Sequence, residues 1–239
     1  MSALRQSTTA VICTLNEEAT LAEVIDAVRP HVDDILVMDG HSTDATQDIA
    51  RSQGAGVALD NGRGKGAAIR QAIDENDADV MVFIDADGSH EASDIPRLVT
   101  PIHRDEADIV IGCRMRGGSD ELAGDWSGFI RLTGQNLLML LVNWRFRTQL
   151  TDMQNGFRAI RTAAVRKLSL AENITTIEQE MTIKAIKAGM RVINVPSHEY
   201  RRKSGYSRIP VLRWSCRYVW TVLREFVKPA RSALKPEHR

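Results

Sequence analysis

Short apolar runs alternate with amphipathic segments through the first half of the chain. The apolar runs are residues 9–15, 33–39, 56–60, 79–85 and 107–114. The segments between them repeat their apolar positions at helical spacing, and they are residues 16–30, 42–54, 64–77 and 92–102. A short buried strand followed by a helix is typical of βαβ units, whose strands form a parallel sheet. The pattern predicts an α/β fold with a mostly parallel, Rossmann-like sheet flanked by helices.

The alternation stops after this half. Residues 115–128 are rich in glycine and polar side chains, which favours a loop. We expect helices at 129–145 and 175–189 and a strand at 190–196. The first of these helices contains the most apolar stretch of the chain, which we interpret as a buried core helix; a helix near a lipid-binding edge is the alternative. No apolar run reaches the roughly 18 residues that a membrane-spanning helix requires.

The C-terminal segment, residues 210–239, begins with an amphipathic helical pattern. Apolar and aromatic side chains such as Trp214 and Tyr218 are interleaved with cations such as Arg217. This mixture suits a helix at a membrane surface, and packing against the core or in a homo-oligomer is the competing interpretation. We expect residues 1–209 to form a single domain, followed by this helix and a tail.

Composition does not change the predicted fold, but it argues against some classes of function. The 31 basic and 31 acidic residues balance, so overall charge does not argue for binding nucleic acid. Three widely spaced cysteines, without a CxxC pair, indicate neither a disulfide framework nor a structural zinc site. The first residues lack the pattern of a secretory signal peptide. We therefore expect a cytoplasmic protein, peripheral on the inner face of the membrane if its C-terminal helix binds lipid.

Two aspartates follow the fourth apolar run, in the sequence VMVFIDADGSH. A strand cannot cheaply bury both Asp85 and Asp87 without a positive charge between them, so we expect both at the strand end, facing a cation. Their spacing with Ser89 resembles an EF-hand, but His90 and Pro96 stand where that loop needs glycine and glutamate. An Asp-x-Asp at a strand end suits Mg²⁺ or Mn²⁺ bridging to a diphosphate. Helix capping or a local turn is the simpler alternative.

Other polar residues follow strands or begin helices. Asp39 ends the second predicted strand, where it contacts a base or ribose; the simpler alternative is that this segment only caps the next helix through Ser42 or Thr43, and both can hold. Lys65 lies between two glycines at the start of a helix, where it either contacts a diphosphate or lies in a solvated turn. Its segment matches neither the P-loop motif nor the GxGxxG motif. Asp152 faces a sugar or caps a turn. Glu178 and Glu180 point to different faces of one helix, so at most one faces a site and solvent is the expectation for each.

Basic residues gather in the polar segment HEYRRKSGYSRI. They are Arg201, Arg202, Lys203 and Arg208. Such a run is usually a solvated face. Together with the upstream aspartates, however, these arginines can clamp phosphates from the side opposite a metal and stabilise negative charge on a leaving group.

In chain order, these segments resemble the motifs of the inverting family 2 glycosyltransferases, which have the GT-A fold. The matching segments are CTLNEEATLAEVI, MDGHSTDAT, GKGAAI, IDADGSH, TDMQNGFRAI and EYRRKSGYSRI. They cover nearly the whole of residues 10–209, and six motifs in order are specific although each alone is weak. Within the family, the chain most resembles the dolichyl-phosphate mannose synthases and related polyprenyl-phosphate glycosyltransferases.

The resemblance implies a binding site for a nucleotide-diphosphate sugar. Glu17 and Asp39 would bind the nucleoside, and the motif GKG keeps Lys65 as a candidate for the diphosphate. Cys13 and Leu15 replace the proline and tyrosine of the first family motif, which leaves open whether the donor is a GDP- or a UDP-sugar. The residues implied to line the diphosphate and the metal are Asp85, Ala86, Asp87 and, where the synthases often have glutamine, Ser89.

The resemblance also implies a reaction. Metal-bound Asp87 and the cation Arg202 would assist departure of the diphosphate, while Arg114 and Arg131 would receive the phosphate of a polyprenyl phosphate acceptor. Such a phosphate is largely ionised at neutral pH and attacks without a protein base.

Two alternatives stay open and two are disfavoured. A soluble glycosyltransferase acting on a small hydroxyl acceptor shares the donor site and needs a carboxylate from Asp152, Glu178 or Glu180. A catalytically silent nucleotide-binding module is compatible with the departures from the family motifs. A nucleotidyltransferase is disfavoured because the first motif has no glycine, and a processive synthase because Pro210 stands where the Q-x-x-R-W segment needs glutamine.

Overall fold

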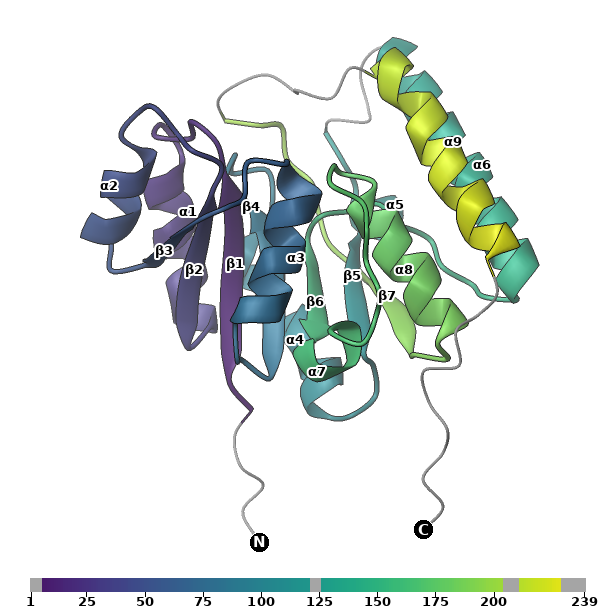
Figure 1. The fold of residues 1–239 in the computed structure, drawn as a ribbon, viewed down its shortest axis with the longest axis horizontal. Coiled ribbons are helices and arrows are strands. Elements are labelled where there is room, and N and C mark those ends of the chain that lie inside the picture. The colour runs from purple at the N-terminus through teal and green to yellow at the C-terminus, as the bar shows by residue number, and fades with distance from the viewer. Residues whose placement is uncertain (1–5, 121–125, 204–210, 229–239) are drawn as a thin grey trace, which may run out of the picture.

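The computed structural model describes residues 6–120, 126–203 and 211–228, and only the backbone of 126–131 and 211–214. Within these residues the fold is built on a seven-stranded sheet of order β3-β2-β1-β4-β6-β5-β7 (Figure 1). Its pairings are parallel, except that β6 runs antiparallel to β4 and β5. The strands are β1 (Thr8–Thr14), β2 (Asp34–Asp39), β3 (Gly56–Leu59), β4 (Val80–Asp85), β5 (Ile109–Cys113), β6 (Arg158–Arg161) and β7 (Val192–Pro196).

Helices cover both faces of this sheet. α1, α2 and α4 share one apolar cluster with the sheet, α3 and α8 share a second cluster, and α6 and α9 lie side by side at the β7 end of the molecule (Figure 1). The helices are α1 (Leu21–Val28), α2 (Thr46–Ser52), α3 (Lys65–Glu75), α4 (Ile95–His103), α5 (Arg114–Gly117), α6 (Trp126–Phe146), α7 (Thr162–Val165), α8 (Ile177–Lys187) and α9 (Val211–Val227), with short 3₁₀ turns η1 (Arg29–His31) and η2 (Ala92–Asp94).

β4 shows why the apolar runs become central strands. Val80, Val82 and Ile84 enter the cluster under α1 and α4, whereas Met81 and Phe83 enter the cluster under α3 and α8. Successive side chains of a strand point to opposite faces, so only an unbroken apolar run can fill both layers. The five predicted strands of the first half and the four helices between them are confirmed.

The second half departs from two expectations. The predicted loop at 115–128 already contains the end of α5 and the start of α6, while residues 121–125 lie outside the described residues. The interpretation of α6 as a buried core helix is wrong in part, because Leu140 and Trp144 are exposed. The helix packs inward through Leu138 and Val142 and leaves its other side uncovered.

Buried charges hold α9 against α8. The carboxylates of Glu172, Glu180 and Glu225 are almost fully buried. The guanidinium of Arg224 donates to Glu172 at 2.6 Å and to Glu180 at 2.9 Å, and the ammonium of Lys187 lies 3.2 Å from Glu225. None of the helices described is both long and apolar enough to cross a bilayer.

The start of α3 is fastened to the loop before α8. The N–H of Gly66 donates to the carbonyl of Asn173 at 2.8 Å. A Cβ added to Gly66 would lie only 2.6 Å from the carbonyl oxygens of Glu172 and Ile174. The absence of a side chain therefore sets how closely α3 approaches α8, and with it the position of Lys65.

We predict that Gly66→Ala lowers the free energy of unfolding by about 1–3 kcal/mol, because the methyl group must displace backbone atoms. Gly134→Ala is the matched control: Gly134 also lies in a helix, but an added Cβ meets nothing within 4 Å. That change should raise stability by up to about 1 kcal/mol, since alanine is the better helix former. Urea unfolding of the two variants measures the difference, and equal effects would contradict the packing argument.

Candidate active site

The strand order reverses at the carboxyl ends of β1 and β4. From β1 the chain adds β2 and β3 on one side and then places β4 on the other side of β1. Open α/β sheets bind ligands at the carboxyl ends of strands beside such a reversal. The register sets Cys13 beside Asp85 and Thr14 beside Asp39, so the two aspartates lie at one edge with β1 between them.

The loops that follow β1 and β2 hold each other at this edge. Asn16 Oδ1 accepts the N–H of Thr43 at 2.8 Å, and the N–H of Glu17 donates to Thr46 Oγ1 at 2.9 Å. Asn16 has φ 55°, a conformation that asparagine tolerates better than most residues. The loops after β1 and β2 are thus joined to each other by hydrogen bonds. Glu17 is half-buried in it, and its contact with a nucleoside stays a prediction.

Asp39 fixes the turn after β2. Its carboxylate, fully buried, accepts from the hydroxyls of Thr14 and Ser42, from the N–H of Ser42 and from the side-chain amide of Gln47, at 2.6–3.2 Å. The expected helix cap by Ser42 or Thr43 is wrong, because α2 begins only at Thr46, after Ala45, and has no side-chain cap hydrogen bond. A contact with base or ribose remains a prediction, and it would be made from a side chain that the turn already orients.

A cavity of about 260 Å³ opens between the sheet edge, α6 and α9. Its two walls differ in chemistry. The charged side chains lining it are Lys65, Asp85, Arg114, Glu178, Glu199 and Arg202. The aliphatic side chains lining it, from α6 and α9, are Leu137, Leu138 and Val219. The sequence-predicted Asp85, Lys65, Arg114 and Arg202 thus meet around one space.

Asp85 is held by Lys65 and His90 at the end of β4. Lys65 Nζ lies 2.5 Å from Asp85 Oδ1 and 3.4 Å from Glu178 Oε1. His90 Nε2 lies 3.6 Å from Asp85 Oδ2, and its ring stacks on Phe157. Burial disfavours the Asp85 carboxylate, but the charge of Lys65 outweighs burial and lowers its pKa; the same attraction raises the pKa of Lys65. Both groups are therefore ionised when the protein is folded.

Glu178 lies inside the cavity rather than in solvent. Only 3% of it is exposed, and its Oε2 has no hydrogen-bond partner among the described residues. Burial raises its pKa, and the nearby cations Lys65 and Arg158 offset only part of that effect. Glu180 is buried too, in the charge network under α9. The expectation of solvent exposure was wrong for both because α8 is enclosed on almost every side.

Asp87 meets the basic segment that follows β7. Arg202 NH1 lies 3.2 Å from Asp87 Oδ2, and the N–H of Ser89 donates to Asp87 Oδ1 at 3.0 Å. The carbonyl of Ser89 accepts the N–H of Tyr200, and the carbonyl of Asp87 accepts that of Lys203. The chain after β7 therefore folds back over the end of β4 and brings Arg202 to the aspartates.

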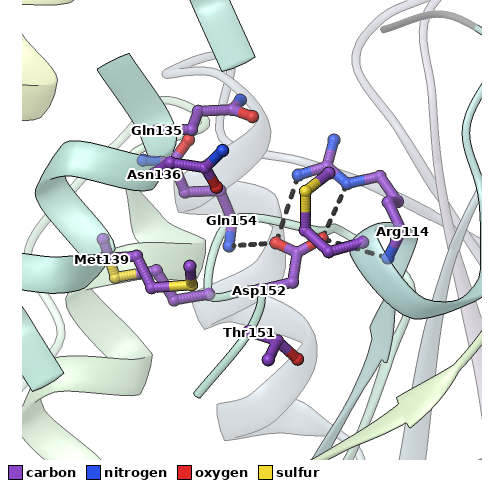
Figure 2. Close-up of a pocket in the computed structure, with 9 residues that line it drawn as sticks. Arg114, Gln135, Asn136, Met139, Thr151, Asp152 and Gln154 are labelled. Carbon is purple, nitrogen blue, oxygen red and sulfur yellow. Dashed lines mark hydrogen bonds and ion pairs between the residues drawn. The ribbon is translucent and has the colours of Figure 1, made fainter. Parts of the chain in front are cut away.

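Arg114 and Asp152 form a buried ion pair in a small pocket beside the main cavity (Figure 2). Arg114 Nε lies 2.8 Å from Asp152 Oδ2, its NH2 lies 3.2 Å from Oδ1, and its NH1 lies 3.5 Å from Glu199. Burial raises the pKa of the Asp152 carboxyl, but Arg114 outweighs it and lowers that pKa. Asp152 thus orients Arg114, which also lines the main cavity. The side chain of Arg131, the other predicted phosphate contact, lies outside the described residues.

A divalent cation fits Asp85 and Asp87 by donor chemistry. Carboxylate oxygens are the ligands that Mg²⁺ prefers and that Mn²⁺ accepts. Among the residues described, however, no three His, Cys, Asp or Glu side chains gather closely enough to hold a metal ion. An ion here would need further oxygens from a bound diphosphate. Ser89 is buried, its backbone groups are engaged as above, and its role as a ligand stays a prediction.

Sequence reasoning missed His90 and Glu199 as parts of the site. His90 follows Asp85 by five residues, and the EF-hand comparison treated it only as a mismatch. Glu199 lies in the basic segment, where its carboxylate contacts Arg114. An acidic residue inside a cationic run is the signal that could have indicated it, since it neutralises a buried cation from elsewhere in the chain.

Comparison with known proteins identifies the family. The model described as "Glycosyl transferase family 2" matches residues 9–175. The chain is 31% identical over 194 residues to glycosyltransferase AglJ of Haloferax volcanii, covering 80% of this chain but only 62% of that protein, so it spans less than two thirds of this relative. It is 28% identical over 246 residues to the undecaprenyl-phosphate mannosyltransferase of Micrococcus luteus, covering 90% and 96% of the two chains.

A solved structure shows the same fold. Glucosyl-3-phosphoglycerate synthase from Mycobacterium tuberculosis, in complex with Mn²⁺, UDP and glucosyl-3-phosphoglycerate, superposes with a TM-score of 0.74 at 22% identity, covering 94% of this chain and 81% of that one. At this sequence identity the similarity is evidence for the fold alone. The chain therefore belongs to glycosyl transferase family 2 and is a glycosyltransferase with the GT-A fold.

Proposed function

We propose that this glycosyltransferase moves a sugar from a GDP- or UDP-sugar onto a polyprenyl phosphate, with inversion at the anomeric carbon. The observation that carries the proposal is the two-sided lining of the cavity. Ionised side chains at the sheet edge form one wall. The wall from α6 and α9 contains the aliphatic Leu137, Leu138 and Val219 together with the polar Gln135, Ser215 and Tyr218. A phosphate on a hydrocarbon chain has the same two parts, whereas a small polar acceptor would leave the aliphatic side chains without a partner.

Two comparisons support the donor and the acceptor. The relative from Micrococcus luteus is named for undecaprenyl phosphate and aligns along nearly its whole length. The structural neighbour holds Mn²⁺ and UDP. We extend these properties to this chain as parts of the proposal, and we place the enzyme at the cytoplasmic surface of a membrane, where a lipid phosphate is available.

The chain's own residues suit the charge changes of the reaction. When bound, Mg²⁺ or Mn²⁺ on Asp87 and Asp85 supplies positive charge to the diphosphate. Arg202, held beside Asp87, offers charge-assisted hydrogen bonds to the same leaving group. Lys65, paired with Asp85 Oδ1, adds a second fixed cation.

The acceptor needs orientation rather than a base. A phosphate monoester has a second pKa of about 6 and is therefore largely dianionic at neutral pH. Arg114, fixed by Asp152 and Glu199, presents its guanidinium to the cavity and can receive this phosphate. A phosphate oxygen then attacks the anomeric carbon as the bond to the diphosphate breaks, without proton transfer to the protein.

A small hydroxyl acceptor is the second candidate, and Glu178 favours it. This buried carboxylate faces the cavity, its Oε2 has no hydrogen-bond partner among the described residues, and burial raises its pKa, as suits a general base. The two candidates differ in what they require of Glu178, because an ionised phosphate needs no base.

We predict a lipid-linked sugar when the protein is given Mn²⁺, a short polyprenyl phosphate and a panel of GDP- and UDP-sugars. Thin-layer chromatography with radiolabelled donors detects the product, and its configuration should be inverted relative to the donor. Transfer only to water-soluble hydroxyl acceptors would move the assignment to the second candidate.

Arg202→Ala should lower kcat/KM by about 100- to 1000-fold, the loss typical of removing a charge-stabilising donor. Arg201→Ala is the matched control, because Arg201 is the neighbouring arginine and is exposed. It should stay within a few-fold of the unsubstituted enzyme. Equal losses in the two variants would show that overall charge, rather than the contact with the aspartates, matters.

Glu178→Gln should retain transfer to polyprenyl phosphate within about tenfold, because no base is required. Loss of transfer to every acceptor, with donor affinity unchanged, would contradict this and favour the hydroxyl acceptor. Isothermal titration with the nucleotide measures donor affinity independently of turnover.

The same variant should change the pH dependence of stability. The folded-state pKa of Glu178 is raised above 4.5, so the folded protein holds this proton more tightly than the unfolded chain. The unsubstituted protein should therefore lose stability relative to Glu178→Gln as pH rises above 4.5, and the difference should be smallest below it. Urea unfolding at a series of pH values measures it, and a difference that shrinks with rising pH would contradict the assignment.

A further inference from the structure

α6 exposes a stripe of large apolar side chains. Leu137, Leu140, Leu141 and Trp144 all lie on the exposed side of the helix, and Trp144 is 78% exposed. Their spacing of three and four residues puts them on one face, opposite the Leu138 and Val142 side that packs inward. A soluble domain normally turns such a stripe towards its core.

α9 exposes a second stripe. Val219, Trp220, Leu223 and Val227 lie one, three and four residues apart, which also places them on one side of a helix, and Trp220 and Val227 are 58% and 85% exposed. The opposite side of α9 faces the protein with Thr221, Val222 and Glu225, which are buried. The helix therefore turns much of its apolar surface away from the domain.

The two stripes begin at the cavity and run in the same direction. Leu137 and Val219, the first members of each, both line the cavity. At the other ends of the helices, the rings of Phe146 and Phe226 meet edge to face, with centroids 5.5 Å apart. The helices lie side by side (Figure 1), and we call the surface formed by their eight stripe residues the α6–α9 face.

The exposed charges on the described parts of these two helices have one sign. Arg145 and Arg147 at the end of α6 and Lys228 at the end of α9 are exposed. Residues 126–147 contain no aspartate or glutamate, and the acid within residues 211–228 is Glu225, which is 1% exposed. The charges that α6 and α9 themselves expose at the ends of the α6–α9 face are therefore cationic.

We propose that the α6–α9 face rests on an anionic lipid bilayer. Aliphatic side chains and two tryptophans would enter the headgroup boundary while the cations meet lipid phosphates. The inference depends on the proposed function, because it brings the cavity between Leu137 and Val219 to the surface from which a polyprenyl phosphate would come. It adds that α6, and not only the C-terminal helix, forms the contact.

Charge favours lipid over a second copy of the chain. A two-fold dimer through this face would set the same patch against itself. Arg145, Arg147 and Lys228 of one copy would then lie against helices of the other copy that expose no acid to neutralise them. An anionic bilayer supplies the missing negative charge.

The test is co-sedimentation of the full chain with vesicles of phosphatidylcholine, with and without phosphatidylglycerol. We expect binding that increases with the anionic lipid. Trp144→Ser combined with Trp220→Ser should weaken partitioning by about tenfold or more, because both rings leave the bilayer boundary. Leu59→Ser is the control: Leu59 is 49% exposed on β3, at the far end of the sheet, and its loss should leave binding unchanged.

Three results would overturn the inference. The first is no binding to anionic vesicles, and the second is equal binding by the double variant and the unsubstituted chain. The third is a dimer in sedimentation velocity that the double variant dissociates while vesicle binding is absent, which would assign the face to a second copy. Circular dichroism of each variant checks that the fold is retained.

Measurements of transferase activity distinguish a failure of this inference from a failure of the proposed function. The double variant should lose transfer to a polyprenyl phosphate embedded in vesicles but keep transfer to a short acceptor dispersed in detergent, since neither tryptophan lines the cavity. Loss of both activities in a folded variant would count against a role limited to docking. Vesicle binding without transfer to any acceptor would leave the docking face standing and refute the proposed function.

Discussion

The charge balance at the end of β4 is the constraint on which the site depends. Asp85 and Asp87 leave a strand that is buried on both faces, and carboxylates in such a place need cations close by. Lys65 comes to Asp85 from the start of α3, and Arg202 comes to Asp87 from the segment after β7. Pairing these charges brings three distant parts of the chain to one edge of the sheet. The same cations then face the cavity in which a diphosphate would bind.

The sequence was most informative where the physics is local. The strand-end aspartates could be predicted because an apolar run and its termination are visible in a few neighbouring residues. Glu178 could not, because its burial depends on α3 and α9 closing around α8. Arg114 and Asp152 were each predicted as site residues, but not as partners, since 38 residues separate them. The exposed side of α6 was only the alternative to a buried core helix, because an apolar run looks the same whether it faces a core or a lipid.

One residue of the site, Glu178, destabilises the folded protein. Burial raises the pKa of Glu178, so holding its carboxylate ionised costs free energy, and Oε2 has no partner among the described residues. Asp85 and Asp152 lie in comparable surroundings, but ion pairs lower their pKa values. A buried acid left in this state within a cavity is the kind of local conflict found more often at functional sites than in cores.

α9 shows how the two walls of the cavity are joined. Its inner side is anchored by polar contacts: Tyr218 hydroxyl lies 2.6 Å from Thr175 Oγ1, and Arg224 pairs with Glu172 and Glu180. An ordinary surface helix in water does the reverse, burying apolar side chains and exposing charges. Because polar and charged side chains anchor the inner side of α9, its apolar residues can lie on the outer side. The same contacts connect α9 to α8, which carries Glu178, and to the loop before α8. A displacement of α9 at its outer surface would therefore reach the charged wall of the cavity through α8.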